Sequence, residues 1–243
     1  MSGYSSTTVS MGPSTRQLFF RPQSSDEDVI QQILGQQQYD LGQIGRTPEL
    51  MQYVRQRAAE GLRPLVVDAG ANIGVSAIYF LANLPEARVV AVEPNADNFA
   101  LLKRNVQGLD VEAIHGAMSS RNGRARVLDP GEGHWAYRTQ MAAEDDAGAV
   151  PCMTLDKIFE AHASGFFPFI VKVDIEGAEE DLFSANTGWV GRTPLLIVEL
   201  HDWLFPRRGT SRPFLQCIAG LDRDFVYRGE DVYSIANDLD GLR

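Results

Sequence analysis

Short apolar segments alternate with helical segments from residue 64 onward, and no other feature of the 243-residue chain constrains its fold as strongly. The runs LVVDAG, RVVAVE, FIVKVD and LLIVEL are continuously apolar, as strands buried on both faces of a sheet are. Segments with helical spacing follow the first three runs, for example GVSAIYFLANL. Strands that alternate with helices favour a mostly parallel sheet covered by helices on both faces. The sequence therefore predicts a doubly wound, Rossmann-like α/β domain over residues 64–243.

The remaining segments predict less regular structure. Residues 1–17 are rich in Ser, Thr and Gly, which predicts a disordered tail. Helical patterns at 24–41 and 48–60 predict a helical N-terminal extension over residues 18–63. Residues 120–150 interrupt the alternation: RARVLD is a candidate strand, and residues 131–149 are expected to form a loop excursion. Long loops beside a regular core often bind ligands.

Charge and hydropathy exclude several classes of protein. Lys and Arg number 22 against 32 Asp and Glu, a net charge of −10, which argues against binding to a nucleic-acid backbone. The polar start lacks the apolar stretch of a signal peptide. A membrane helix would need about 18 consecutive apolar residues, and the sequence has no such run. We therefore expect a cytoplasmic protein without a nucleic-acid or membrane partner; the sequence leaves an oligomer open.

The motif VVDAGANIG joins an expected strand to an expected helix through a glycine turn. Gly70 lets the backbone pass close to a ligand, and Gly74 lets the helix begin against the sheet. A dinucleotide-binding G-x-G-x-x-G pattern would need glycines where Asn72 and Val75 stand, which counts against a dehydrogenase. Asp68 would repel a pyrophosphate but would help to bind a cationic ligand.

Glu93 ends the next strand, 25 residues after Asp68. In doubly wound folds an acidic residue at this place binds the ribose hydroxyls of an adenosine cofactor. Hydroxyls donate hydrogen bonds and a carboxylate accepts them. The spacing therefore indicates a nucleoside-containing cofactor.

A second polar group follows the last two buried runs: Asp174, Glu176, Glu199 and His201. Within a strand, residues two apart point to one face, and neighbouring strands lie about 5 Å apart, so the four side chains are expected to meet. Such a cluster can do acid–base chemistry on a hydroxyl. It could also bind a divalent cation, but that alternative is not favoured because no dense ligand signature such as HExxH occurs.

His201 is the first candidate for the catalytic base, because its unperturbed pKa is about 6.5 and Glu199 could orient its ring. Asp174 is the competing candidate, and it could instead bind the amine of the cofactor. A structural role for each pair stays open, since Glu176 could cap the following helix. Lys172 is expected on the same face, where it would neutralise the acids.

DAGANIG followed by VEPN resembles the cofactor motifs of class I S-adenosylmethionine-dependent methyltransferases. IVKVDIEGAE and IVELH resemble the FkbM family within that class, and the resemblance covers about residues 64–235. It implies a seven-stranded sheet whose last strand is antiparallel, and S-adenosylmethionine as the methyl donor. It further implies O-methylation of a hydroxyl on a sugar or a small-molecule natural product.

The resemblance also implies roles for single residues. The methionine half of the cofactor would be surrounded by Asp68, Gly70, Asn72 and Gly74. Glu93 would bind the ribose, and the adenine would lie against Asn95, Phe99, Ala117 and Met118.

The acceptor side is expected in the irregular segments. Trp135 and Tyr137, in the loop 130–147, are expected to contact a small-molecule or glycan acceptor together with Glu176 and the N-terminal helix. N-methylation, or a module that binds the cofactor without catalysis, remains an alternative function.

Overall fold

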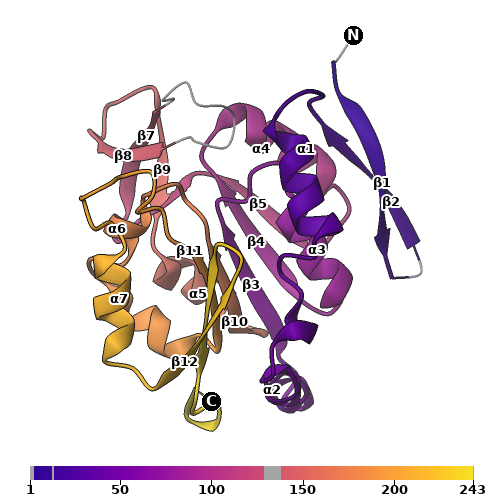
Figure 1. Ribbon diagram of the computed structural model, residues 1–243, viewed down its shortest axis with the longest axis vertical. Coiled ribbons are helices and arrows are strands. Elements are labelled where there is room, and N and C mark those ends of the chain that lie inside the picture. Colours follow the sequence, from indigo (N-terminus) through magenta and orange to yellow (C-terminus); the bar gives the residue numbers. More distant parts are fainter. Residues whose placement is uncertain (1–2, 13, 129–137, 243) are drawn as a thin grey trace.

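A seven-stranded sheet forms the centre of the computed structural model, which describes residues 3–12, 14–128 and 138–242 (Figure 1). Its strands in chain order are β3 (Arg63–Ala69), β4 (Arg88–Glu93), β5 (Val111–His115), β10 (Phe166–Val173), β11 (Leu195–Glu199), β12 (Arg223–Arg228) and β13 (Asp231–Ala236). In space they lie in the order β12-β13-β11-β10-β3-β4-β5.

The order of the strands reverses at the middle of this sheet. The chain runs outward from β3 through β4 to β5 and then returns to β10 on the other side of β3. These strands and β11 are parallel, whereas β13 is antiparallel to both of its neighbours. In open α/β sheets ligands bind at the carboxyl ends of the strands beside such a reversal. The expected doubly wound α/β class is confirmed, and its topology directs attention to the ends of β3 and β10.

Helices cover both faces of the sheet and enclose two hydrophobic cores (Figure 1). One face carries α2 (Thr47–Ala59), α3 (Val75–Asn83) and α4 (Ala96–Asn105), with a short 3₁₀ turn at Asp240–Leu242. The other carries α5 (Leu155–His162), α6 (Glu179–Leu182) and α7 (Arg212–Ala219), with a short 3₁₀ turn at Thr187–Arg192. Successive residues of β3 enter opposite cores: Val66 faces one, and Leu65 and Val67 face the other. This two-sided burial explains why the strands read as continuous apolar runs.

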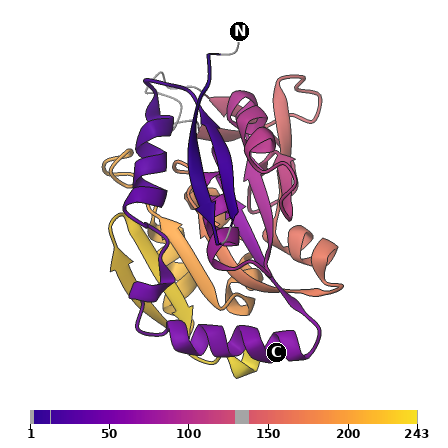
Figure 2. The same ribbon diagram turned by 90° about the vertical axis from the view of Figure 1, so that its right-hand side faces the viewer.

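An antiparallel hairpin replaces the disordered tail that we expected at residues 1–17. Its strands β1 (Ser5–Met11) and β2 (Ser14–Phe20) lie against α3 and α4 (Figure 2). Val9 and Leu18 are buried in the core beneath it. Asn105 at the end of α4 accepts a hydrogen bond from the backbone N–H of Phe19 (2.8 Å) and donates one to its carbonyl (2.9 Å). Because the other side chains of the hairpin are mostly small and polar, its composition resembles that of a tail.

The segment 18–63 begins with the end of strand β2, and the first of its two predicted helices is shorter than expected. The helix predicted over 24–41 is regular only in α1 (Ser25–Ile30). It continues as a π-helical turn over Gln31–Gly35, and a 3₁₀ turn over Leu41–Gln43 precedes α2. Gln37 has a φ of 54°, a left-handed conformation that a continuing helix does not allow. The helix therefore ends before Tyr39, which is buried against Phe80.

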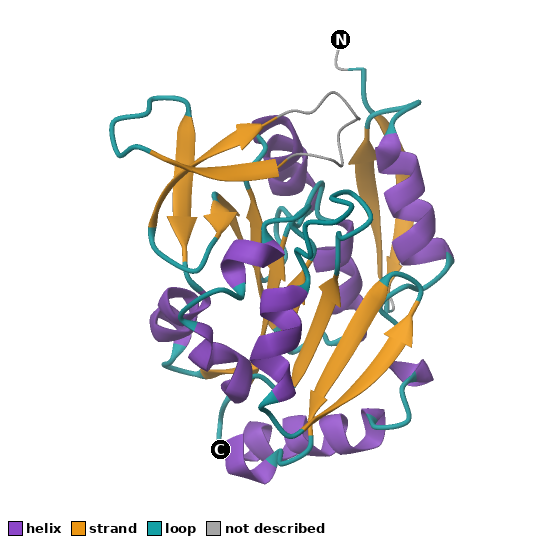
Figure 3. Ribbon diagram, turned by 60° about the vertical axis from the view of Figure 1, so that its left-hand side comes forward, coloured by secondary structure: helices purple, strands orange, loops and turns teal. Residues whose placement is uncertain are grey.

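A small second sheet contains the candidate strand at RARVLD and extends into the residues 131–149 that we expected to be a loop excursion. Its strands β6 (Ala117–Met118), β7 (Gly123–Leu128), β8 (Arg138–Ala142) and β9 (Ala149–Met153) lie in the order β6-β9-β7-β8 (Figure 3). The excursion is therefore in part regular structure, a correction caused by pairing between strands that the sequence separates. Trp135 and Tyr137, the predicted acceptor contacts, lie outside the described residues.

The described helices are short. The longest of them, α2, has 13 residues. A transmembrane helix needs about 20 apolar residues. Within the described part of the chain, no helix combines the length and the apolar character that crossing a membrane requires.

Candidate active site

The glycine turn after β3 is shaped by close packing against the end of β10. Gly70 has a φ of 80°, and a Cβ built on it would lie 1.7 Å from the carbonyl oxygen of Asp174. Gly74 caps α3 with a φ of 89°, and a Cβ there would lie 2.7 Å from Leu102 Cδ1. Both positions therefore require glycine, and Gly70 does so because two strand ends meet there.

Asp68 lies beneath this turn and is fully buried. Its Oδ2 accepts a hydrogen bond from Ser76 (2.5 Å), and its Oδ1 lies 3.2 Å from Lys172 Nζ. Lys172 also donates to the carbonyl of Gly70 (2.8 Å) and lies 3.3 Å from Asp174 Oδ2. Asp68 and Lys172 thus support the turn, and Asp68 is not among the described residues that line the adjacent cleft.

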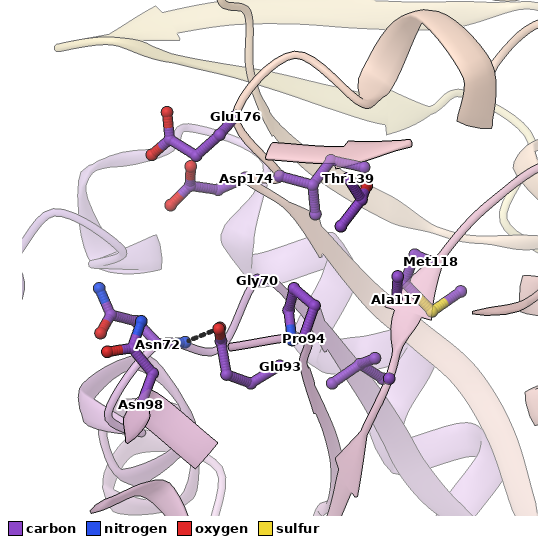
Figure 4. Close-up of a pocket in the computed structure, with 13 residues that line it drawn as sticks. Gly70, Asn72, Glu93, Pro94, Asn98, Ala117, Met118, Thr139, Asp174 and Glu176 are labelled. Atoms are coloured by element: carbon purple, nitrogen blue, oxygen red, sulfur yellow. Dashed lines mark hydrogen bonds between the residues drawn. The ribbon is translucent and has the colours of Figure 1, made fainter. Parts of the chain in front are cut away.

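Glu93 ends β4 at the floor of that cleft and is 5% exposed. Its Oε2 accepts the backbone N–H of Asn72 (2.9 Å), drawn as a dashed line in Figure 4, and its Oε1 accepts that of Asn95 (2.8 Å). Burial raises the pKa of Glu93 to about 7, although these two backbone hydrogen bonds oppose the rise. Each carboxylate oxygen keeps further acceptor capacity for the hydroxyls of a ligand.

The cleft beside Glu93 contains most of the predicted cofactor residues (Figure 4). Its described lining is Gly70, Asn72, Val92, Glu93, Pro94, Asn98, Gly116, Ala117, Met118, Thr139, Asp174, Ile175 and Glu176. Gly70, Asn72, Ala117 and Met118 therefore lie around one cavity between the ends of β3, β4 and β10, and their contact with a cofactor stays a prediction.

Two predicted adenine contacts have structural roles instead. Asn95 caps α4, because its side chain accepts the backbone N–H groups of Asp97 (3.0 Å) and Asn98 (2.9 Å). Phe99 stacks on His115 with ring centroids 4.8 Å apart. Neither is among the described lining residues, and Asn98, which the sequence analysis missed, faces the cleft from the same helix.

The four polar residues after β10 and β11 meet around one histidine. His201 Nε2 lies 3.4 Å from Glu176 Oε2, 3.4 Å from Glu199 Oε1 and 3.7 Å from Asp174 Oδ1. The cluster predicted from sequence is therefore present. Its geometry differs from the prediction, because β10 ends at Val173 and Glu176 adopts a left-handed φ of 55° in the following turn.

A fifth residue, Glu179, completes the cluster and was not predicted. Its Oε1 lies 3.1 Å from His201 Nδ1 and accepts the backbone N–H of Ile175 (3.0 Å). Glu179 is 1% exposed. Its spacing of five residues from Asp174 gives no signal of this contact, because α6 only begins at Glu179 itself.

The charges of the cluster change the role expected of His201. Burial lowers the pKa of His201, but hydrogen bonds to Glu179 and Glu199 and nearby negative charge outweigh burial and raise it to about 11. Burial and the charge of Asp174 raise the pKa of Glu176 to about 8. In this arrangement His201 is an imidazolium at neutral pH and carries no lone pair with which to accept a proton.

A larger cleft of about 650 Å³ adjoins the first. It shares Met118, Thr139 and Glu176 with the first cleft and extends to Arg208 and Phe205. The small second sheet and α6 form its walls. The N-terminal helix, predicted on the acceptor side, supplies none of the described lining residues of either cleft.

Comparisons with known proteins identify related sequences. The model of the methyltransferase FkbM domain matches residues 68–227. The curated protein methyltransferase sdnD from Sordaria araneosa is 38% identical over 64 residues, which are 25% of this chain and 25% of that protein. The chain thus matches about a quarter of the length of this curated relative. The family match includes Glu93, Asp174 and His201.

Solved structures give more distant matches. The O-methyltransferase from Bacillus cereus in complex with SAH is 13% identical with a TM-score of 0.40, over 88% of this chain and 92% of that chain. Monomeric WbdD is 11% identical with a TM-score of 0.43, over 80% of this chain and 41% of that chain.

Proposed function

The chain belongs to the methyltransferase FkbM domain family, and on that premise we propose that it transfers a methyl group from S-adenosylmethionine to a hydroxyl oxygen of a sugar or another small molecule. The observation that carries this proposal is Glu93. Its two oxygens are fixed by backbone N–H groups at the floor of a cleft, where a ribose could donate both hydroxyls.

The first cleft suits the parts of this cofactor. Glu93 would accept the ribose hydroxyls, and Ala117 and Met118 offer a backbone strand and apolar surface for the adenine. Gly70 and Asn72 would lie against the methionine half, and Asp174 offers a negative charge for its ammonium group. S-adenosylmethionine supplies a methyl group activated by a sulfonium, so the protein has mainly to align donor and acceptor and to remove a proton.

The second cleft is our proposed acceptor site, because it shares Met118, Thr139 and Glu176 with the first cleft and has polar as well as apolar lining residues. Gln140, Asp181 and Arg208 offer hydrogen-bonding groups of both kinds. This lining favours a hydroxylated acceptor over an apolar one.

Asp174 is our proposed proton acceptor or positioning group for that hydroxyl. It lines the first cleft, and its side chain is 25% exposed. Lys172 holds its Oδ2 at 3.3 Å, which leaves Oδ1 to face His201 and the cavity. His201 and Glu199 would keep Asp174 in place. A nearby base matters because a protonated hydroxyl is a poor nucleophile.

A radiolabelled cofactor tests the proposal directly. The purified protein is incubated with methyl-labelled S-adenosylmethionine and fractionated small-molecule extract, and the labelled product is identified by mass spectrometry. A methyl ether supports the proposal. A methylated amine would replace O- by N-methylation, and calorimetric binding of cofactor without any labelled product would indicate a binding module.

A further inference from the structure

One group among the described residues, Asp174, Glu176 and His201, places three potential metal ligands within 4.8 Å of one another. Glu199 is not one of these three, but its Oε1 lies 3.4 Å from His201 Nε2 at the edge of the group. The distances from Nε2 to the three carboxylates, 3.4, 3.4 and 3.7 Å, exceed those of ordinary N–H···O hydrogen bonds. Ligands about 2.0–2.1 Å from one Mg²⁺ in an octahedron lie about 2.9 Å apart when adjacent and about 4.1 Å apart when opposite, and the observed spacings lie between these values.

One of these ligand atoms is buried without a hydrogen-bond partner. Glu176 Oε2 has none among the described residues, and it lies 3.4 Å from Nε2 of His201, whose side chain is 1% exposed. Buried polar atoms normally have partners, so Glu176 Oε2 points to a missing ligand beside the imidazole.

The opposite side of the histidine ring is already fixed. Glu179 Oε1 lies 3.1 Å from Nδ1, and the backbone N–H of Ile175 holds the same oxygen. Histidines that bind metals usually donate their other ring N–H to a carboxylate, which sets the tautomer and aims the ring. Glu179 supplies this carboxylate and directs Nε2 toward the other acids.

Negative charge exceeds positive charge around this point. Asp174, Glu176, Glu179 and Glu199 surround one imidazole, and Lys172 is the only lysine or arginine in the described ion pairs of this cluster. Lys172 is shared with Asp68. A divalent cation would balance the excess, taking the place of the proton on Nε2.

We propose that Asp174, Glu176, Glu199 and His201 bind one divalent cation of the Mg²⁺ or Mn²⁺ class, with Glu179 as a positioning residue. Carboxylate-rich sets suit these ions, and an imidazole is tolerated more readily by Mn²⁺. Asp174 is the most exposed of the four and keeps one side of the site open to the clefts. If the proposed methyl transfer holds, on which this role rests, a cation here would lower the pKa of an acceptor hydroxyl.

Mn²⁺ alone tests the site, without cofactor or acceptor. The full chain is treated with a chelator, dialysed and titrated with Mn²⁺, and the loss of the free-ion signal is followed by electron paramagnetic resonance. One ion per chain is expected. Glu199→Gln and His201→Ala should weaken binding by more than about tenfold, and Glu179→Gln by about 10–100-fold. Glu180→Gln is the matched control, because this neighbour on α6 has a side chain that is 47% exposed.

Absence of Mn²⁺ binding would overturn the inference, and so would equal binding by wild type and Glu199→Gln. The isosteric Glu199→Gln decides the test if His201→Ala does not fold, as judged by circular dichroism. Methyl transfer that persists fully in chelator would overturn the catalytic role and leave the proposed function standing. Bound Mn²⁺ without transfer to any acceptor would support the site and count against the proposed function.

Discussion

The buried carboxylate at the end of β4 and those at the ends of β10 and β11 differ in how fully they are hydrogen-bonded. Each oxygen of Glu93 accepts a backbone N–H, so this carboxylate is held in place before any ligand arrives. Around His201, by contrast, Glu176 Oε2 lacks a hydrogen-bond partner among the described residues, and the acids outnumber the cations. The first region is preorganised by the main chain, whereas the second keeps an unpaired carboxylate oxygen and an excess of negative charge.

Removal of His201 should have the largest effect on activity, and it should act on the cluster around His201 without changing the Glu93 region. His201→Ala is expected to lower kcat for methyl transfer by about 10²–10⁴-fold, because the acids would lose the group that arranges them. Cofactor affinity by titration calorimetry should change little, since His201 is not among the described residues that line the first cleft. An unaltered kcat, with chemistry shown to be rate-limiting, would move the reaction away from this cluster.

Gly70→Ala should disturb both regions at once, because Gly70 lines the cleft beside Glu93 and packs against the backbone of Asp174 after β10. The new Cβ would lie 1.7 Å from the carbonyl oxygen of Asp174. We expect the free energy of unfolding, measured with urea, to fall by more than about 3 kcal/mol. Gly61→Ala is the matched control: Gly61 also has a positive φ, but its surroundings are open, so a loss of only about 1–2 kcal/mol is expected. Equal losses would mean that the contact with Asp174 is unimportant.

Glu93→Ala should affect only the preorganised region. Loss of the hydrogen bonds to a ribose costs about 1.5–3 kcal/mol, which weakens S-adenosylmethionine binding by about one to two decades. Titration calorimetry measures the change, and Glu112→Ala on the neighbouring strand β5, with a side chain that is 41% exposed, is the control. Wild-type affinity in Glu93→Ala would contradict the assignment of the cleft.

The pH dependence of cofactor binding should give the smallest effect. Burial raises the pKa of Glu93 to about 7, so the carboxylate that accepts the hydroxyls is lost as pH falls through 7. We expect affinity to fall about tenfold between pH 8 and pH 6 in wild type. In Glu93→Gln, which has no proton to lose at this site, this part of the pH dependence should disappear. The same slope in both proteins would assign it to another group.

The two regions also differ in how far the sequence predicted them. The turn at Gly70 and the position of Glu93 follow from local order, because the strand, the glycine and the helix are adjacent in the chain. The family resemblance placed Asn95 and Phe99 beside the adenine. A helix start favours a capping side chain, however, and the side chain of Asn95 caps α4. Motif spacing therefore located the cleft but not every side chain in it.

The meeting of the acids around His201 was predictable from the order of the strands, but its protonation was not. The pKa of His201 depends on Glu179, whose contact arises from the tight turn after Asp174. In the same way, the β1–β2 hairpin depends on Asn105, which is 86 residues from Phe19. Long-range contacts of single polar side chains leave no local pattern in the sequence, so the contacts of Glu179 and Asn105 could be found only in the structure.

Asn105 also has a consequence for the order in which the molecule is assembled during synthesis. Its fully buried amide donates both to Phe19 O and to Ile73 O, within the turn that ends at Gly74. The hairpin leaves the ribosome before α4 but cannot dock until α4 has been made. A nascent chain halted before residue 105 should therefore expose the hairpin to proteases, and the full-length chain should protect it.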